Sequence, residues 1–261
     1  MKKPVFILLA VLVACQAKKT DTETQSVAAT AAAPSFFIAL DPASQMISDY
    51  LVHPTLDLSR YTLGGVFPVS DFMPDNKNEG LLMWYCFDTS RKQIFMAIEP
   101  LHHYDTASLP KAPLQAILKK PEQTFLYTNP SPAPADVKDF ILNQKLTGAS
   151  ANLGQAVAAR YVKSFDSLMQ KTQDAAGKSY QKYPLNYFIW WNDYKTFVSW
   201  AGTDGYIRYY YGFDEGHTPN RIRIVLIAAD KNGNTITGAQ AQSEDGGGEG
   251  LQNGWPPPPF H

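Results

Sequence analysis

The sequence of 261 residues has almost no net charge. Lysine and arginine together number 23, and aspartate and glutamate number 24, so the formal net charge at pH 7 is −1. A chain without excess positive charge has no long-range attraction for nucleic acid or for an anionic surface. We therefore expect no nucleic-acid partner.

The sequence also lacks the short motifs that identify common enzyme classes. It contains no Gly-x-Ser-x-Gly elbow, phosphate-binding loop, dinucleotide-binding glycine fingerprint or His-Glu-x-x-His motif. Residues 102–105 and 244–249 carry histidines or carboxylates, but not at the spacing of zinc or calcium ligands. The sequence therefore predicts no metal or other cofactor and favours a protein that is not an enzyme.

Apolar runs are short, and the one at the N-terminus is too short to cross a bilayer. Lys2 and Lys3 precede the apolar residues 5–14, and Cys15 follows them. A membrane-spanning helix needs about 20 apolar residues, whereas a basic start and a shorter apolar core are typical of a secretory leader. We predict that residues 1–14 are a signal peptide.

The end of this leader, LVAC at residues 12–15, resembles the lipobox of bacterial lipoproteins. The resemblance implies that the leader is removed and that Cys15 becomes a lipidated first residue carrying acyl chains such as palmitate. Several acyl chains hold a protein stably on a membrane. Gln16 in place of aspartate resembles the Gram-negative signal for the outer membrane, so we expect a lipid-anchored protein of the cell envelope.

Two alternatives to lipidation remain for the cysteines. The leader is then an ordinary secretory signal with an incidental cysteine, or cleavage occurs elsewhere and Cys15 pairs with Cys86. If Cys15 is lipidated, Cys86 has no partner cysteine in the chain. Its apolar setting, LLMWYCF at residues 81–87, favours a buried structural cysteine, because a reactive thiol needs an electropositive and partly exposed setting.

The composition changes near residue 35. The preceding residues are mostly polar or small, and such a segment cannot bury enough apolar surface to offset its ordering entropy. We predict that residues 15–34 are a flexible tether. We divide the aromatic-rich remainder into two units, residues 35–148 with a proline-rich connector and residues 149–261 with a tail rich in glycine and proline.

This division rests on a weak internal repeat. The first copy contains GGVFPVSDF, LLMWYCFD and QIFMAIEP within residues 64–100, and the second contains FIWWNDYKTF, YIRYYYGFD and RIRIVLIAAD within residues 188–230. In each copy an aromatic-x-Phe-Asp sequence ends one strand, at Asp88 and at Asp214. Alternation and β-propensity predict a β-hairpin in each copy.

A helix is predicted before each hairpin. Asp41 and Pro42 are typical of a helix start, and Pro54 is typical of a helix end. The apolar stripes are Ala43, Met46, Ile47, Tyr50 and Leu51 in this helix, and Val157, Tyr161, Phe165, Leu168 and Met169 in a second helix at residues 153–171. The expected fold is α+β, with two related helix-plus-β-hairpin units forming a mainly antiparallel sheet that helices cover.

The C-terminal half also resembles a group of small bacterial proteins. From residue 187 it contains an aromatic pair with Asn192 and Asp193, then DGYIRYYYG at residues 204–212, an apolar strand and a glycine-rich tail that ends in four prolines. The resemblance supports the fold and the limits of the second unit. It implies no catalytic residues, since those proteins have no assigned activity.

Aromatic side chains of the second copy are the candidate binding residues: Trp190, Trp191, Trp200, Tyr209 and Tyr211. Flat aromatic faces bind sugars and peptides, although the same side chains also fill cores. Our working hypothesis is a tethered binding or interaction module that presents an aromatic surface to a glycan, peptide or protein of the cell envelope.

The alternative is a cell-envelope hydrolase of unrecognised type. It would use either Asp88 with Asp214 as paired carboxylates or Cys86 with His102 as nucleophile and base. The simpler interpretation of the two aspartates is that each opens the turn after its strand by hydrogen bonding to nearby backbone.

Overall fold

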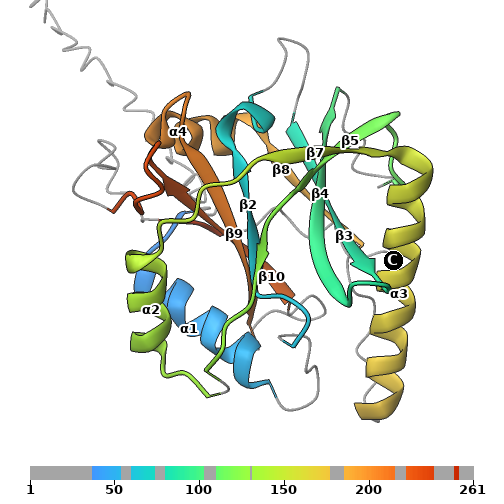
Figure 1. Cartoon of the computed structure of the whole chain (residues 1–261), viewed down its shortest axis with the longest axis horizontal. Coiled ribbons are helices and arrows are strands. Elements are labelled where there is room, and N and C mark those ends of the chain that lie inside the picture. The colour runs from blue at the N-terminus through green and yellow to red at the C-terminus, as the bar shows by residue number, and fades with distance from the viewer. Residues whose placement is uncertain are drawn as a thin grey trace, which may run out of the picture. The chain divides into compact units, whose positions relative to one another are not determined.

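Two antiparallel sheets pack face to face, and helices lie on their outer faces (Figure 1). The computed structural model describes residues 37–53, 60–73, 80–102, 110–129, 131–176, 185–214, 222–237 and 250–252. The signal peptide, the lipobox, the tether and the proline-rich end predicted above lie outside these residues.

The first sheet is built around the second predicted hairpin. In spatial order its strands are β1 (Phe37–Ile38), β11 (Gly250–Gln252), β10 (Ile222–Ala229), β9 (Tyr206–Phe213), β2 (Gly64–Pro68) and β6 (Thr124–Phe125). Strands β9 and β10 pair along their whole length, from Phe213 opposite Ile222 to Tyr206 opposite Ala229. The second hairpin is therefore confirmed.

The second sheet is built around the first predicted hairpin. In spatial order its strands are β7 (Ser150–Gly154), β5 (Ile117–Pro121), β4 (Gln93–Leu101), β3 (Gly80–Asp88) and β8 (Asn186–Trp190). Strands β3 and β4 pair from Gly80 opposite Leu101 to Asp88 opposite Gln93. The first hairpin is confirmed as well.

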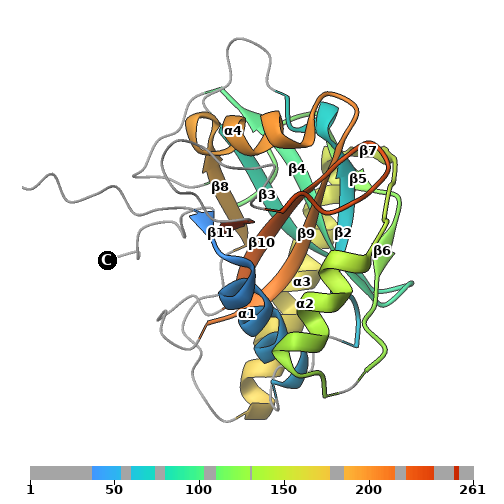
Figure 2. The same cartoon turned by 90° about the vertical axis from the view of Figure 1, so that its left-hand side faces the viewer.

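Four α-helices accompany these sheets in the described residues. They are α1 (Leu40–Val52), α2 (Pro134–Asn143), α3 (Gln155–Ala176) and α4 (Trp191–Ala201), and a short 3-10 turn, η1 (Val69–Asp71), follows β2. Helices α1 and α2 lie on the outer side of the first sheet, α3 lies behind the second sheet, and α4 lies at one end (Figure 2). The order of layers is helix, sheet, sheet, helix.

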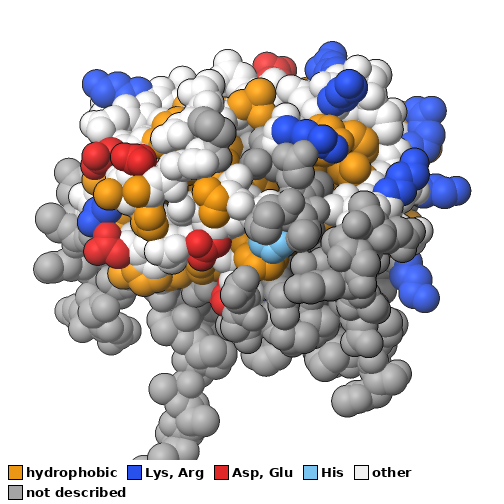
Figure 3. Space-filling view, turned by 90° about the horizontal axis from the view of Figure 1, so that it is seen from below, with side chains coloured by type: hydrophobic (Ala, Val, Ile, Leu, Met, Phe, Trp, Pro, Cys, Tyr) orange, Lys and Arg blue, Asp and Glu red, His pale blue; other side chains and the backbone are white. Residues whose placement is uncertain are grey.

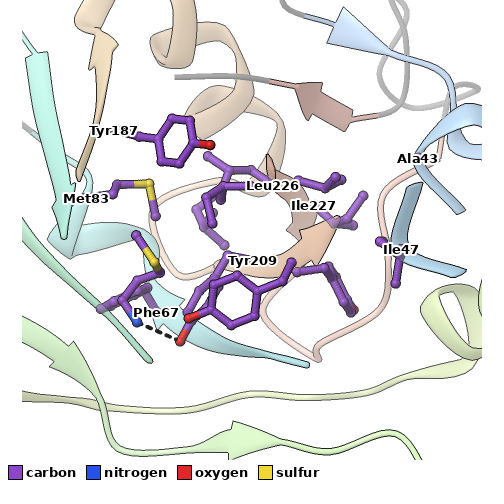
Figure 4. Packing of buried hydrophobic residues seen from close by; sticks show 14 of the residues in the cluster. Ala43, Ile47, Phe67, Met83, Tyr187, Tyr209, Leu226 and Ile227 are labelled. Atoms are coloured by element: carbon purple, nitrogen blue, oxygen red, sulfur yellow. Dashed lines mark hydrogen bonds between the residues drawn. The ribbon is translucent and has the colours of Figure 1, made fainter. Parts of the chain in front are cut away.

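The central strands are apolar on both faces because one face of each sheet lines the core between the sheets and the other face is covered by helices. Tyr209 and Leu226 of the first sheet pack toward Met83 of the second (Figure 4). The hydroxyl of Tyr209 accepts a 3.1 Å hydrogen bond from the backbone N–H of Met96 and so links the two sheets. A second, smaller cluster lies between the second sheet and α3 and includes Trp84 and Cys86.

The α+β class, the antiparallel pairing and the covering helices are confirmed, but the sequence missed several details. The strands form two sheets rather than one. Most of the aromatic segment FIWWNDYKTF, for which no helix was expected, lies in helix α4, which ends at Gly202 with a φ of 74°. The proline-rich connector contributes β5, which was missed, and residues 153–154 belong to β7 rather than to the second helix, whereas the connector's short elements β6 and α2 agree with the short strand and helical turn that its sequence permits.

The strand that precedes each hairpin pairs with the other hairpin. Strand β2 pairs with β9, with Gly64 opposite Tyr210, and β8 pairs with β3, with Gly80 opposite Trp190. The helices follow the same rule, because α1 packs on β9 and α3 packs on β3. Contacts between residues group 35–261 into a single unit.

Candidate functional site

Two of the predicted binding residues lie inside the core. Tyr209 and Tyr211 are 0% and 1% exposed, respectively. The ring of Tyr211 stacks on that of Tyr85, with 5.9 Å between ring centroids. These tyrosines hold the two sheets together, so they are not part of a binding surface, and the prediction is corrected for them.

The three predicted tryptophans are half-buried. The ring of Trp190 contacts Phe188 edge-to-face at 4.8 Å, and the ring of Trp191 contacts Tyr194 in the same way at 4.8 Å. Trp190 packs against the core cluster beneath α3, whereas Trp191 and Trp200 pack against the cluster between the sheets. Each indole thus has a packing role, and the three do not share one environment.

Asp88 shapes the turn between β3 and β4. Its Oδ1 accepts hydrogen bonds from the backbone N–H groups of Ser90 (2.9 Å) and Arg91 (3.2 Å) and from the Ser90 hydroxyl (2.6 Å). Slight burial works against ionisation, but these hydrogen bonds hold the pKa of Asp88 below its usual value. Asp214 follows β9, in the other sheet. The turn-opening interpretation accounts for Asp88 without a catalytic role.

The alternative pair of Cys86 and His102 is not brought together. Cys86 is fully buried, and its burial raises the pKa of the thiol. It lies opposite Phe95 in β4, whereas His102 follows Leu101 at the far end of that strand. At about 3.4 Å per residue, roughly 20 Å of strand separates Phe95 from Leu101. A nucleophile and its base must be within hydrogen-bonding distance, so the prediction that Cys86 and His102 act as a catalytic pair is wrong.

A groove beside α3 is a candidate site that described residues line on every side. Its volume is about 410 Å³, and it lies between the exposed side of α3 and the end of β3. Its lining residues are Phe87, Thr89, Arg160, Lys163, Ser164, Ser167, Leu168 and Lys171.

Helical periodicity places six of these residues on one side of α3. Positions 160, 163, 164, 167, 168 and 171 recur every three or four residues, so they share one face of the helix. The buried side of the helix is formed by Val162, Phe165 and Met169. Packing of this apolar side on the second sheet therefore turns the cationic side outward, next to the hairpin turn that carries Thr89.

The groove is positively charged. Arg160, Lys163 and Lys171 are exposed, no carboxylate lines the groove, and none of the three cations forms an ion pair within the described part of the chain. Lysine and arginine side chains gather on the side of the molecule that carries α3 (Figure 3). The nearby Asp166 points its carboxylate to Gln170, from which it accepts a 3.2 Å hydrogen bond.

Hydroxyl groups and a small apolar floor complete the groove. Ser164 and Ser167 stand between the cations, Thr89 faces them from the hairpin turn, and Phe87 and Leu168 supply apolar surface. Such a lining can hold anionic groups by charge, hydroxyl groups by hydrogen bonds and apolar faces by contact.

The apolar stripe of this helix led to its prediction from the sequence, whereas the groove was not predicted. The spacing of Arg160, Lys163 and Lys171 on the opposite side is the signal that was available. Phe87 and Thr89 carry no such signal, because only tertiary packing brings the hairpin to the helix.

Comparison with known proteins adds no assignment for this site: no family model matches the chain, and neither a curated protein nor a solved structure does. In the ranges that the structure describes, no three His, Cys, Asp or Glu side chains are grouped as metal ligands. No helix within those ranges has the length and apolar character needed to cross a membrane.

Proposed function

We propose that this protein is an exported, lipid-anchored binding module of the cell envelope, and that its ligand is an anionic glycan, peptide or protein held in the groove beside α3. The observation that carries the proposal is the set of three cations, Arg160, Lys163 and Lys171, which line one groove without a neutralising carboxylate. Unpaired cations in a concave site attract and orient a ligand of opposite charge.

The chemistry of the groove favours binding over catalysis. Its serines have no histidine or carboxylate beside them in the lining to act as a base. Cys86 is buried beneath α3, and Asp88 is bonded to its own turn. The side chains that line the groove are therefore suited to hold a ligand rather than to transfer a proton or attack a bond.

The proposed location rests on the sequence. The lipobox-like residues 12–15 support a lipid anchor on Cys15 and export to the outer membrane of a Gram-negative bacterium. Residues 15–34 would then act as a tether between the membrane and the folded part, with a reach that grows with roughly the square root of its length.

We also infer that the fold arose by internal duplication. Each copy contains a helix, a strand and a hairpin in the same order. The strand of the first copy, β2, pairs with the hairpin strand β9 of the second copy, and the strand of the second copy, β8, pairs with the hairpin strand β3 of the first. This reciprocity supports two related units that share both sheets.

Binding can be tested with dextran sulfate and with neutral dextran as the control ligand, using calorimetry on the full-length chain in detergent. We expect binding of dextran sulfate only, with an affinity that falls as salt screens the charges. Replacement of Arg160, Lys163 and Lys171 by alanine should weaken binding about tenfold or more.

A matched control removes three exposed lysines that lie outside the groove, Lys111, Lys145 and Lys231. This variant should bind as the wild type does. Equal loss in both variants, or equal binding of neutral dextran, would show that the groove is not the site. In a separate test of the anchor, Cys15→Ser should move the protein from the membrane fraction to the soluble fraction.

A further inference from the structure

We propose that the groove beside α3 binds an extended acidic polysaccharide, whose carboxylates contact cations at both ends of the groove. This inference rests on the proposed function and goes further, since it states the length of the ligand and its chemical class.

The length follows from the spacing of the cations along the helix. An α-helix rises about 1.5 Å per residue, so Arg160 and Lys171 lie roughly 16 Å apart along its axis. Side chains on one face of a helix tilt in the same direction and so keep this spacing, and one sulfate or phosphate group would then not contact both. Arg160 and Lys163 are about one turn apart and can share one anionic group or two adjacent ones. A ligand that uses the whole groove therefore carries anionic groups separated by at least about 12 Å, the axial rise from Lys163 to Lys171.

The chemical class follows from what lies between the cations. Ser164 and Ser167 offer hydroxyl groups that both donate and accept hydrogen bonds. Sugar hydroxyls have the same dual capacity, and the C–H face of a sugar ring can pack on Phe87 and Leu168. A polyphosphate chain offers acceptors but neither donors nor an apolar face, and the donors of an acidic peptide are confined almost entirely to its backbone N–H groups. An acidic polysaccharide offers carboxylates to the cations, hydroxyl groups to the serines and a C–H face to Phe87 and Leu168.

The concave form of the site also bears on the class of ligand. A flat bilayer surface would contact the exposed lysines and Ser167 but would not reach Phe87, which is only 8% exposed. A single chain lying along the helix can contact both the lysines and Phe87.

The test is a length series of galacturonate oligomers, from the monomer upward, titrated into the full-length chain in detergent. We expect affinity to rise with length until the oligomer spans the groove and then to level off. Lys171→Ala should remove most of the gain shown by long oligomers and should lower the affinity of the shortest binding oligomers much less. Lys145→Ala, outside the groove, should change neither.

The outcomes separate the two proposals. If dextran sulfate binds in the groove but galacturonate affinity does not depend on length, or Lys171→Ala has no effect on long oligomers, the extended ligand is wrong and the anion site stands. If polyphosphate or polyglutamate of equal charge binds more tightly than the oligogalacturonate, the polysaccharide class is wrong. If no polyanion binds in the groove, the proposed function fails as well.

Discussion

The indole N–H of Trp84 donates a 2.7 Å hydrogen bond to Oε1 of Glu99, and both side chains are fully buried. Glu99 also accepts hydrogen bonds from the backbone N–H of Leu114 (3.0 Å to Oε2) and of Gln115 (2.7 Å). One carboxylate thus ties β3 and β4 to the segment that leads into β5. A buried carboxylate is tolerated when donors surround it in this way.

Glu99→Gln should destabilise the protein, because the substituted amide presents an N–H₂ group to N–H donors. Loss of one acceptor leaves a buried donor without a partner, and we expect the free energy of unfolding to fall by about 1–3 kcal/mol. Urea unfolding at neutral pH measures the change. Glu122→Gln, at an exposed position, is the control and should change stability little. Equal stability of the Glu99→Gln variant and the wild type would contradict the structural role of Glu99.

Glu99 should also titrate at an unusual pH. Burial raises its pKa, although the donors from Gln115, Leu114 and Trp84 oppose the rise. The protonated form is therefore favoured by folding, and the stability that this group contributes is fully present below the unfolded pKa of about 4.3 and is lost as pH rises through the folded pKa. The indole ¹H–¹⁵N signal of Trp84 reports this titration by NMR. We expect a midpoint above about 4.3 and no such transition in Glu99→Gln, and a midpoint below that value would show that the donors dominate.

The hairpins and the helices α1 and α3 could be predicted because their signals are local. The alternation in β9 and the apolar stripe of α1 lie within one element each, so no partner is needed to recognise them. The division into two sheets could not be predicted, since strands that are apolar on both faces do not specify which strand pairs with them. Helix α4 was missed because its aromatic residues favour strands, even though Tyr194, Phe197 and Ala201 recur at helical spacing.

The candidate site was missed for a different reason. A net charge of −1 describes the whole chain, whereas binding depends on where the charges lie. Packing of α3 collects cations on one side, and the turn after β3 adds a wall from a region about 70 residues earlier in the chain. The aromatic residues chosen instead included Tyr209 and Tyr211, because aromatic side chains are suited both to binding surfaces and to cores, and the sequence does not separate the two uses.

Gly65 in β2 lies directly against the ring of Tyr209, and the space there excludes any side chain. A Cβ at Gly65 would come within 2.6 Å of the Tyr209 hydroxyl oxygen. Gly65→Ala should force the ring to move in a packed core and lower the free energy of unfolding by about 1–3 kcal/mol. Gly154→Ala in β7 is the matched control, since a Cβ there meets nothing within 4 Å. Thermal unfolding of the two variants should differ clearly, and equal melting temperatures would show that the core adjusts around Gly65.

The reciprocal pairing predicts that neither proposed unit folds alone. Residues 35–148 contain the β3–β4 hairpin but lack β8 and α3, which cover it, and residues 149–261 contain the β9–β10 hairpin but lack β2 and α1. Each half would expose the apolar face that the other half buries, and burial of that face is the main stabilising contribution.

Separately expressed halves should therefore show NMR spectra with little chemical-shift dispersion and no cooperative thermal transition. An equimolar mixture of the two halves should regain the thermal transition of residues 35–261 expressed as one chain. A half that unfolds cooperatively by itself would mean that its own strands suffice and that the exchanged strand and helix are accessory. Such a result would make the two units independent domains, as division at residue 148 alone would suggest, whereas reconstitution on mixing would make them two parts of one folding unit.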